Sequence, residues 1–255
     1  QDIRGKITSE TKMIVVTHAS NVTGAIAPLK EISAIAQEFN LVLCVDAAQT
    51  AGIIPIDVQR DKIHLLALAG HTGLLGPQGV GCLYVDPKLN LAPLIHGGTG
   101  SNSFEEDQPA KMPERLEAGT LNTPGIAGLG EGIRYIQKVG IDKIRDHKQG
   151  LMEYVLEELQ KINGIELYGP IKGITRAGVI SFNIKGINSH EVALILDQHY
   201  QIAVRGGVHC APLAHQALTT EDQGAVRISF GYSNTLAEVK AFIKAIQEIV
   251  DGLLG

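Results

Sequence analysis

The sequence predicts an α/β protein: a mostly parallel sheet in its first part and a smaller α+β region after it. Two observations predict this class. Short, uninterrupted apolar runs alternate with an amphipathic helical pattern, as in βαβ units whose strands are covered on both faces. The 255 residues are 44% hydrophobic but only 4% aromatic, with no Trp, which indicates a mainly aliphatic core. This length suffices for one large domain or two smaller ones.

The first elements form a βαβ unit. Apolar runs at 13–17 (MIVVT) and 41–45 (LVLCV) predict two parallel strands buried on both faces. Residues 28–39 between them place their apolar side chains on one helical face, with Pro28 in the first turn. The order strand, helix, strand predicts a right-handed crossover. Two further strands are predicted at 64–69 and 82–85.

The second part begins after a Gly-rich and polar stretch at 96–120, which predicts loops. A long helical pattern starts near Pro124 and is interrupted near 139–141. The remaining predicted elements are strands at 165–168, 178–184, 202–205 and 226–231 and a helix at 189–200. A final amphipathic helix begins with the capping box Thr235-x-x-Glu238. We predict two domains, at 1–135 and 136–255.

Charge and cysteine content exclude several classes of function. The formal net charge is −5 and no basic run occurs, so neither nucleic acid nor a membrane surface is an expected partner. No apolar stretch reaches the roughly 18 residues of a membrane span, and no signal peptide is visible. Three cysteines make no disulfide framework, which indicates a cytoplasmic protein. No metal site is expected.

Polar residues follow three of the predicted strands. His18 and Asn21 follow the first, Asp46 and Gln49 follow the second, and His71 follows the third within a glycine-rich loop. In an open parallel sheet, ligands bind outside the carboxyl ends of the strands. Singly, Asp46 is about as often a capping or turn residue, and a lone His or Asn at a strand end is more often a turn or hydrogen-bonding residue than a ligand contact. The glycine spacing fits neither nucleotide-binding fingerprint.

Taken together, the motifs HASN, VDAAQ and GH-x-G-x-x-GP-x-G-x-G resemble the aminotransferase class V family, the fold-type-I enzymes that depend on pyridoxal phosphate (PLP). Further similar motifs follow in family order: EAGTLNTPGI at 117–126, RAGVISFNI at 176–184, VRGGVHCAP at 204–212 and VRISFGYSNT at 226–235. The cysteine in GVHCAP makes the resemblance nearest to cysteine desulfurases and selenocysteine lyases. The resemblance implies a large PLP-binding domain and a smaller C-terminal domain.

The resemblance also implies which residues bind the cofactor. Asp46 matches the carboxylate that pairs with the pyridinium nitrogen. A carboxylate there keeps the ring protonated, so that the ring can act as an electron sink. Gln49 matches the residue that hydrogen-bonds the ring hydroxyl, and Asn21 the one that reaches this hydroxyl or the substrate carboxylate. His71 matches a phosphate contact, and Thr120 one that reaches a phosphate across a homodimer interface.

For the substrate, Arg227 matches the guanidinium that binds the amino-acid carboxylate, and Arg205 lies near the same site in the family. Cys210 matches the cysteine that takes sulfur from cysteine, or selenium from selenocysteine, and releases alanine. A persulfide is left on the enzyme for a sulfur-acceptor protein. Cys44 and Cys82 stand within apolar strands and are expected to be inert core residues.

The sequence departs from the family pattern at a decisive position. The family has a lysine directly after the His of the GH motif, which bonds covalently to PLP and moves the α-proton, whereas this chain has Thr72. Covalent attachment of PLP is therefore not expected. About a third of a usual family chain, on its N-terminal side and including the phosphate-binding helix N-terminus, has no match here. We therefore expect a partial large domain with an exposed apolar edge.

Three interpretations remain open at this stage. The chain is a variant or fragment of a desulfurase, impaired by Thr72. Alternatively, it is a degenerate homologue that has lost catalysis and acts as a binding protein. A class V aminotransferase or lyase with another substrate is the third interpretation.

Overall fold

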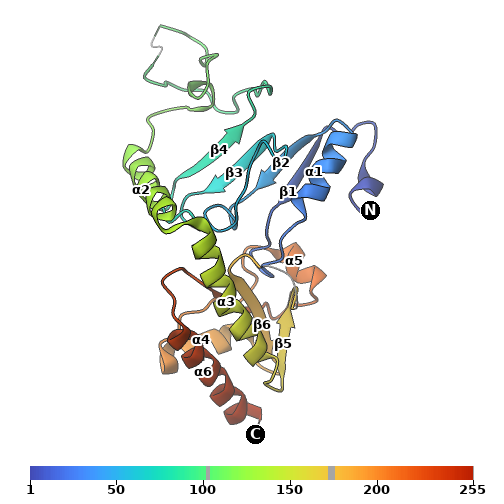
Figure 1. Cartoon of the computed structure of the whole chain (residues 1–255), viewed down its shortest axis with the longest axis vertical. Helices are drawn as coiled ribbons and strands as arrows, with labels where there is room; N and C mark the ends of the chain where they lie inside the picture. Colours follow the sequence, from blue (N-terminus) through green and yellow to red (C-terminus); the bar gives the residue numbers. More distant parts are fainter. Residues whose placement is uncertain (102–103, 172–175, 255) are drawn as a thin grey trace.

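The computed structural model describes residues 1–101, 104–171 and 176–254 and contains two β-sheets (Figure 1). The first sheet has the order β1-β2-β3-β4. Its strands are β1 (Met13–Thr17), β2 (Val42–Asp46), β3 (Leu65–Ala69) and β4 (Gly81–Val85). Strands β1 to β3 are parallel and β4 is antiparallel to β3. The predicted mostly parallel sheet is confirmed.

Helices α1 (Leu29–Glu38) and α2 (Thr123–Val139) contribute to the core beside this sheet. The βαβ unit forms because the apolar side chains of α1 fall on one face and pack onto the alternate residues of β2. Buried members of this core include Leu29, Ile32, Ala36, Leu41, Leu43, Val45, Ile63, Leu66 and Leu129.

The opposite face of the first sheet is open at its two edge strands, β1 and β4, although Leu65 of β3 on the same face is buried. Val15 on β1 is 70% exposed and Leu83 on β4 is 51% exposed. The prediction that the first strand is buried on both faces is therefore wrong, whereas the expected exposed apolar surface is present. Cys82 is exposed at the sheet edge, so its expected place in the core is also wrong, and Cys44 is half-buried.

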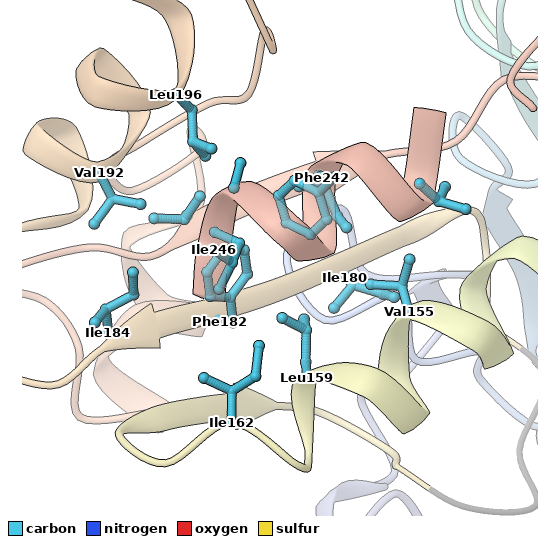
Figure 2. Close-up of a cluster of buried hydrophobic side chains, with 14 of the residues drawn as sticks. Val155, Leu159, Ile162, Ile180, Phe182, Ile184, Val192, Leu196, Phe242 and Ile246 are labelled. Atoms are coloured by element: carbon cyan, nitrogen blue, oxygen red, sulfur yellow. The ribbon is translucent and has the colours of Figure 1, made fainter. Parts of the chain in front are cut away.

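The second sheet has the order β5-β6-β7 and is antiparallel throughout. Its strands are β5 (Ile165–Tyr168), β6 (Val179–Ile184) and β7 (Val226–Ser229). Helices α3 (Ile141–Leu159), α4 (Ser189–Tyr200) and α6 (Leu236–Leu254) enclose one face of it. Phe182 and Phe242 meet edge to face in this core, with ring centroids 6.0 Å apart (Figure 2).

Helix α3 runs from the first sheet to the second (Figure 1). Its Ile144 belongs to the core of the first sheet, and Leu151 to Leu159 contribute to the core of the second. The break before it lies at Gly140, whose φ of 94° is in the region that favours glycine. The predicted interruption near 139–141 is confirmed.

The capping box of α6 also forms as predicted. The backbone N–H of Thr235 donates to the Glu238 carboxylate at 2.6 Å, and the N–H of Glu238 donates to the Thr235 hydroxyl at 3.3 Å.

The predicted strand at 202–205 is absent. The N–H of Ile202 donates to the Leu196 carbonyl at the end of α4, so the segment begins as a helix terminus. Only Arg205 forms a bridge, with Arg227. Three short helices lacked a sequence prediction: η1 (Arg4–Lys6), η2 (Glu114–Leu116) and α5 (Pro212–Ala217). Across the described part of the chain, no helix combines the length and apolar character needed to cross a membrane.

Candidate functional site

The loop after β1 makes hydrogen bonds between the part of the chain that forms the first sheet and the part that forms the second, here called the first and second halves. The Asn21 amide nitrogen Nδ2 donates to the His209 carbonyl at 2.7 Å. The Asn21 carbonyl in turn accepts from Nη1 of Arg227 at 3.0 Å. Asn21 therefore connects the loop that carries Cys210 with the arginine of β7.

Two buried side chains from the second half hold the next residues of this loop. The Ser181 hydroxyl donates to the Val22 carbonyl at 2.6 Å, and Nη1 of Arg176 donates to the Thr23 carbonyl at 2.9 Å. Arg176 also donates to the carbonyls of Tyr168 and Pro170. Because buried hydrogen-bonding groups are costly to leave unpaired, these contacts fix the loop against the second sheet.

A cavity of about 350 Å³, here called the central cavity, lies between the two sheets. Gln49, after β2, and Thr72, after β3, line it from the first half, and Lys148 of α3 and Arg227 of β7 line it from the second. The two strand ends meet here because the carboxyl ends of β2 and β3 lie at the same edge of the sheet. The size is typical of a small-ligand site.

Asp46 and Thr72 both interact with the turn between β2 and the following loop. The Asp46 carboxylate accepts from the N–H of Ala48 at 2.9 Å, which is a local turn contact. The Thr72 hydroxyl donates to the Ala48 carbonyl and lies 3.3 Å from the Ala69 carbonyl. Position 72 therefore brings a hydroxyl beside this turn, where the family pattern has an amine.

Arg227 is half-buried and incompletely paired. Burial first, and the positive charge of Arg205 second, lower the pKa of its guanidinium from the ordinary value. Its Nε is buried and finds no hydrogen-bond partner within the described residues. Because no acidic side chain is among the described residues that line the central cavity, an anionic ligand is the complementary occupant.

Lys148 is a cavity residue that the sequence analysis missed. It is 8% exposed, and burial lowers the pKa of its amine to about 8. A sequence signal was available, because Lys148 stands four residues from Ile144 and from Met152, both buried on the apolar face of α3. Lys148 is 76 residues away from Thr72 along the chain, and α3 brings it to the same cavity.

Cys210 lines a second cavity of about 380 Å³, here called the cysteine pocket. Arg205, His190 and His209 line the same pocket. The Arg205 guanidinium donates to the Cys210 Sγ, with Nη2 and Sγ 3.5 Å apart. Arg205 and Arg227 exchange two backbone hydrogen bonds of 2.8 and 3.1 Å. The arginine of the cysteine pocket therefore lies directly beside the arginine of the central cavity.

The backbone around Cys210 has an unusual conformation. His209 and Cys210 have φ values of 53° and 59°, in the left-handed region that costs free energy for residues other than glycine. The preceding Gly207 has φ of 105°, which requires glycine. Asn21 holds the His209 carbonyl, so a residue of the first half stabilises this conformation.

His209 is a buried, neutral imidazole. Its Nε2 lies 2.9 Å from the Ala225 carbonyl, which can only accept, so Nε2 carries the proton. Burial first, and the charge of Arg227 second, lower the pKa of His209 to about 4. Its Nδ1 has no partner among the described residues.

The predicted site residues thus divide into three groups. Gln49, Thr72 and Arg227 share the central cavity, Arg205 and Cys210 share the cysteine pocket, and Asn21 connects the two through its hydrogen bonds. Asp46 lies at the turn that Thr72 contacts. His71 and Thr120 are exposed and line neither cavity.

Comparison with known proteins gives consistent results. The aminotransferase class-V family model matches residues 1–242. A probable cysteine desulfurase of Pyrococcus abyssi is 39% identical over 95% of this chain and 60% of its own length. A cysteine desulfurase of Salmonella agona is 41% identical over 79% of this chain and 50% of its own length. The chain spans about 60% of the length of several such curated relatives.

Solved structures agree with these sequence matches. An apo cysteine desulfurase of Thermococcus onnurineus superposes with a TM-score of 0.88 at 39% identity, covering 95% of this chain and 60% of that one. The S-sulfonic acid form of an Escherichia coli cysteine desulfurase gives a TM-score of 0.88 at 28% identity, covering 98% and 62%. The predicted fold class, that of fold-type-I PLP enzymes, is confirmed. The chain belongs to the aminotransferase class-V family.

Proposed function

We propose that this chain has the cysteine desulfurase function of its relatives in a form impaired by Thr72, with Cys210 as the residue that accepts sulfur. Family membership implies PLP as the cofactor. The observation that carries the proposal is the connection made by Asn21. Its amide holds the Cys210 loop, and its carbonyl holds Arg227 of the central cavity.

The residues at the central cavity fit PLP held without a covalent bond to position 72. The buried Arg227 Nε without a partner and the absence of acidic lining residues in the described part suit an anionic ligand. Of the lining residues, Gln49 would pair with the ring hydroxyl. The family resemblance further implies Asp46 for the ring nitrogen and His71 and Thr120 for the phosphate, from outside the cavity lining. When bound, PLP supplies an electron sink for a carbanion at the substrate α-carbon. Thr72 can neither bond to it nor move the α-proton.

The remaining residues act on the amino acid. Arg227 binds its carboxylate through a guanidinium, and Asn21 orients the arginine. The Cys210 thiolate attacks the sulfur of substrate cysteine, so an S–S bond forms as the substrate C–S bond breaks. The substrate carbon takes a proton and leaves as alanine, and the persulfide remains on Cys210. The Arg205 guanidinium, which donates to Sγ, would orient this sulfur for the attack.

The test is alanine release from cysteine in the presence of added PLP. We expect little alanine from the chain with Thr72 and a rise of at least tenfold after Thr72→Lys. Cys210→Ala in the Thr72→Lys background should abolish alanine release, whereas Cys82→Ala, which removes another exposed thiol, should not. Alanine release that survives Cys210→Ala would contradict the assignment of this residue.

The alternatives predict different outcomes of the same assay. A binding protein that has lost catalysis would bind PLP but release no alanine even with Thr72→Lys. An aminotransferase would return the amino group to an oxo acid and lose little activity with Cys210→Ala. Selenocysteine in place of cysteine distinguishes a selenocysteine lyase.

We extend the proposal to organisation and partners. A homodimer would bring the exposed Thr120 toward the phosphate site of a second copy, and a sulfur-acceptor protein would approach the exposed Cys210. The separate cores of the two sheets support a division into two domains near 1–135 and 136–255, although Ile136 and Ile144 still belong to the first core. All three cysteines are free, which supports a cytoplasmic location.

A further inference from the structure

We propose that Lys148 is a reactive amine of the central cavity, which forms an imine with an aldehyde whose anionic group Arg227 binds. The inference rests on the proposed function in one respect, namely that the cavity accepts an anionic ligand. PLP belongs to this class of aldehyde, and glyoxylate is its smallest useful member. Lys148 would then supply from α3 an amine that position 72 lacks.

The surroundings of Lys148 leave its amine desolvated. Lys148 is 8% exposed, and its side chain lies against Gly178, where an added Cβ would come within 2.8 Å of Nζ. Within the described part of the chain, Lys148 forms neither a hydrogen bond nor a salt bridge. Burial alone accounts for the lowered pKa of about 8. Lysines that are desolvated in this way are the ones that react with carbonyl groups.

The other charged groups of the cavity favour an anionic ligand. Arg227 of β7 is the other cation that lines it, and Tyr232 is the remaining titratable side chain there in the described part. His147, the neighbour of Lys148 on α3, has its Nε2 bonded to the Asn234 carbonyl at 2.8 Å. A ligand with a carboxylate or phosphate at Arg227 would therefore hold its aldehyde within the same cavity as the Lys148 amine.

The chemistry needs no further reactant. The Lys148 nitrogen attacks the carbonyl carbon, a C=N bond forms, and the carbonyl oxygen leaves as water with both amine protons. Cyanoborohydride then adds hydride to the imine carbon and makes the link permanent. The modified lysine can be located by peptide mass spectrometry.

The experiment treats the whole chain with glyoxylate, with PLP, or with neutral propionaldehyde, each with cyanoborohydride at pH 7.5. We expect Lys148 to be labelled at least fivefold more than Lys143, an exposed lysine of the same helix. Arg227→Gln should reduce labelling by glyoxylate several-fold and leave labelling by propionaldehyde unchanged. Labelling at Lys148 should rise as the pH increases through about 8.

Two variants provide the controls. Lys148→Met, which keeps the buried aliphatic chain, should remove the dominant label, and Lys143→Met should not. If circular dichroism shows that Lys148→Met does not fold, the comparison of labelling at Lys148 and Lys143 in the unchanged chain still tests the inference. Labelling of Lys148 no greater than that of Lys143 would overturn the inference. Alanine release by the Thr72→Lys chain is measured separately, so failure of the desulfurase proposal is distinguished from failure of this one.

Discussion

His209 shows how the site constrains a single residue. The imidazole is 1% exposed, its Nε2 donates to the Ala225 carbonyl, and Arg205 and Arg227 both disfavour its protonation. A positive charge on His209 would lie close to the guanidinium groups of Arg205 and Arg227, which would repel it. The folded protein therefore keeps this residue neutral in the neutral pH range.

This predicts a loss of stability in acid. The folded pKa of His209 is about 4, below the value of about 6.5 for an unfolded chain, so only the unfolded state takes up a proton between these values. The contribution of His209 is complete above pH 6.5 and is lost as the pH falls toward 4. We expect about 2 kcal/mol of unfolding free energy to disappear over this range.

Urea unfolding at several pH values measures this effect. His209→Gln retains a donor for Ala225 but does not titrate, so its stability should fall less between pH 6.5 and 4. His199→Gln, at an exposed position of α4, should retain the full pH dependence. His18 and His215 also have pKa values lowered by burial, so the comparison between variants isolates His209. Equal slopes for both variants would show that His209 is protonated in the folded state.

At the scale of single residues, the sequence predicts those site residues that stand in recognisable motifs. Asn21, Gln49 and Arg227 were predicted from the strand-end pattern and the resemblance, and the structure places all three at or beside one cavity. Lys148 was missed because its partners come from other elements: Thr72 follows β3 and Arg227 lies on β7. Local patterns cannot show which distant residues share a cavity.

At the scale of elements, the packing of α2 depends on glycines. Gly132 is buried against the turn after β3, and a Cβ there would lie 2.3 Å from the Leu74 carbonyl oxygen. Gly130, two residues earlier, has only the flexible end of Arg134 nearby, at 3.5 Å. The two glycines therefore form a matched pair within one helix.

We expect opposite effects of alanine at these two positions. Gly132→Ala should lower the unfolding free energy by about 2 kcal/mol, because the helix must move away from backbone that cannot yield. Gly130→Ala should raise it by up to about 1 kcal/mol through helix propensity. Thermal unfolding measures both. Equal stabilisation by both substitutions would show that α2 does not pack as described.

The elements themselves were largely predictable because their signals are local. The amphipathic pattern of α1, the capping box of α6 and the break at Gly140 each lie within a few neighbouring residues. The segment 202–205 was mispredicted because its apolar residues serve the end of α4 and not a strand ladder. Helix α5 has six residues, too few for a periodic pattern to be recognised.

At the scale of the whole molecule, the two sheets have different environments. The second sheet is enclosed by three helices, and all six residues of β6 are buried. The first sheet has a covered face and an open face, and β1 alternates between exposed and half-buried residues. An apolar strand sequence specifies that both faces suit burial, but not whether another part of the molecule covers them.

The open face should make the isolated chain bind hydrophobic dyes. Val15 and Leu83 project from it, and neither contributes to the core beneath the sheet. We expect fluorescence of an anilinonaphthalene dye with the folded chain, and at least a twofold reduction with Val15→Thr and Leu83→Thr together. Threonine retains strand propensity, so the melting temperature should change little.

The control comes from β2, on the opposite face of the same sheet. Val45→Thr places a hydroxyl at a fully buried position of β2, so it should destabilise the chain and increase dye binding. The two kinds of substitution thus differ in the sign of their effect on dye binding, although all three replace an aliphatic side chain with threonine. If the unchanged chain is folded and binds no dye, the first sheet has no open apolar face in solution. A monomer by sedimentation is required for that conclusion, because self-association would also cover Val15 and Leu83.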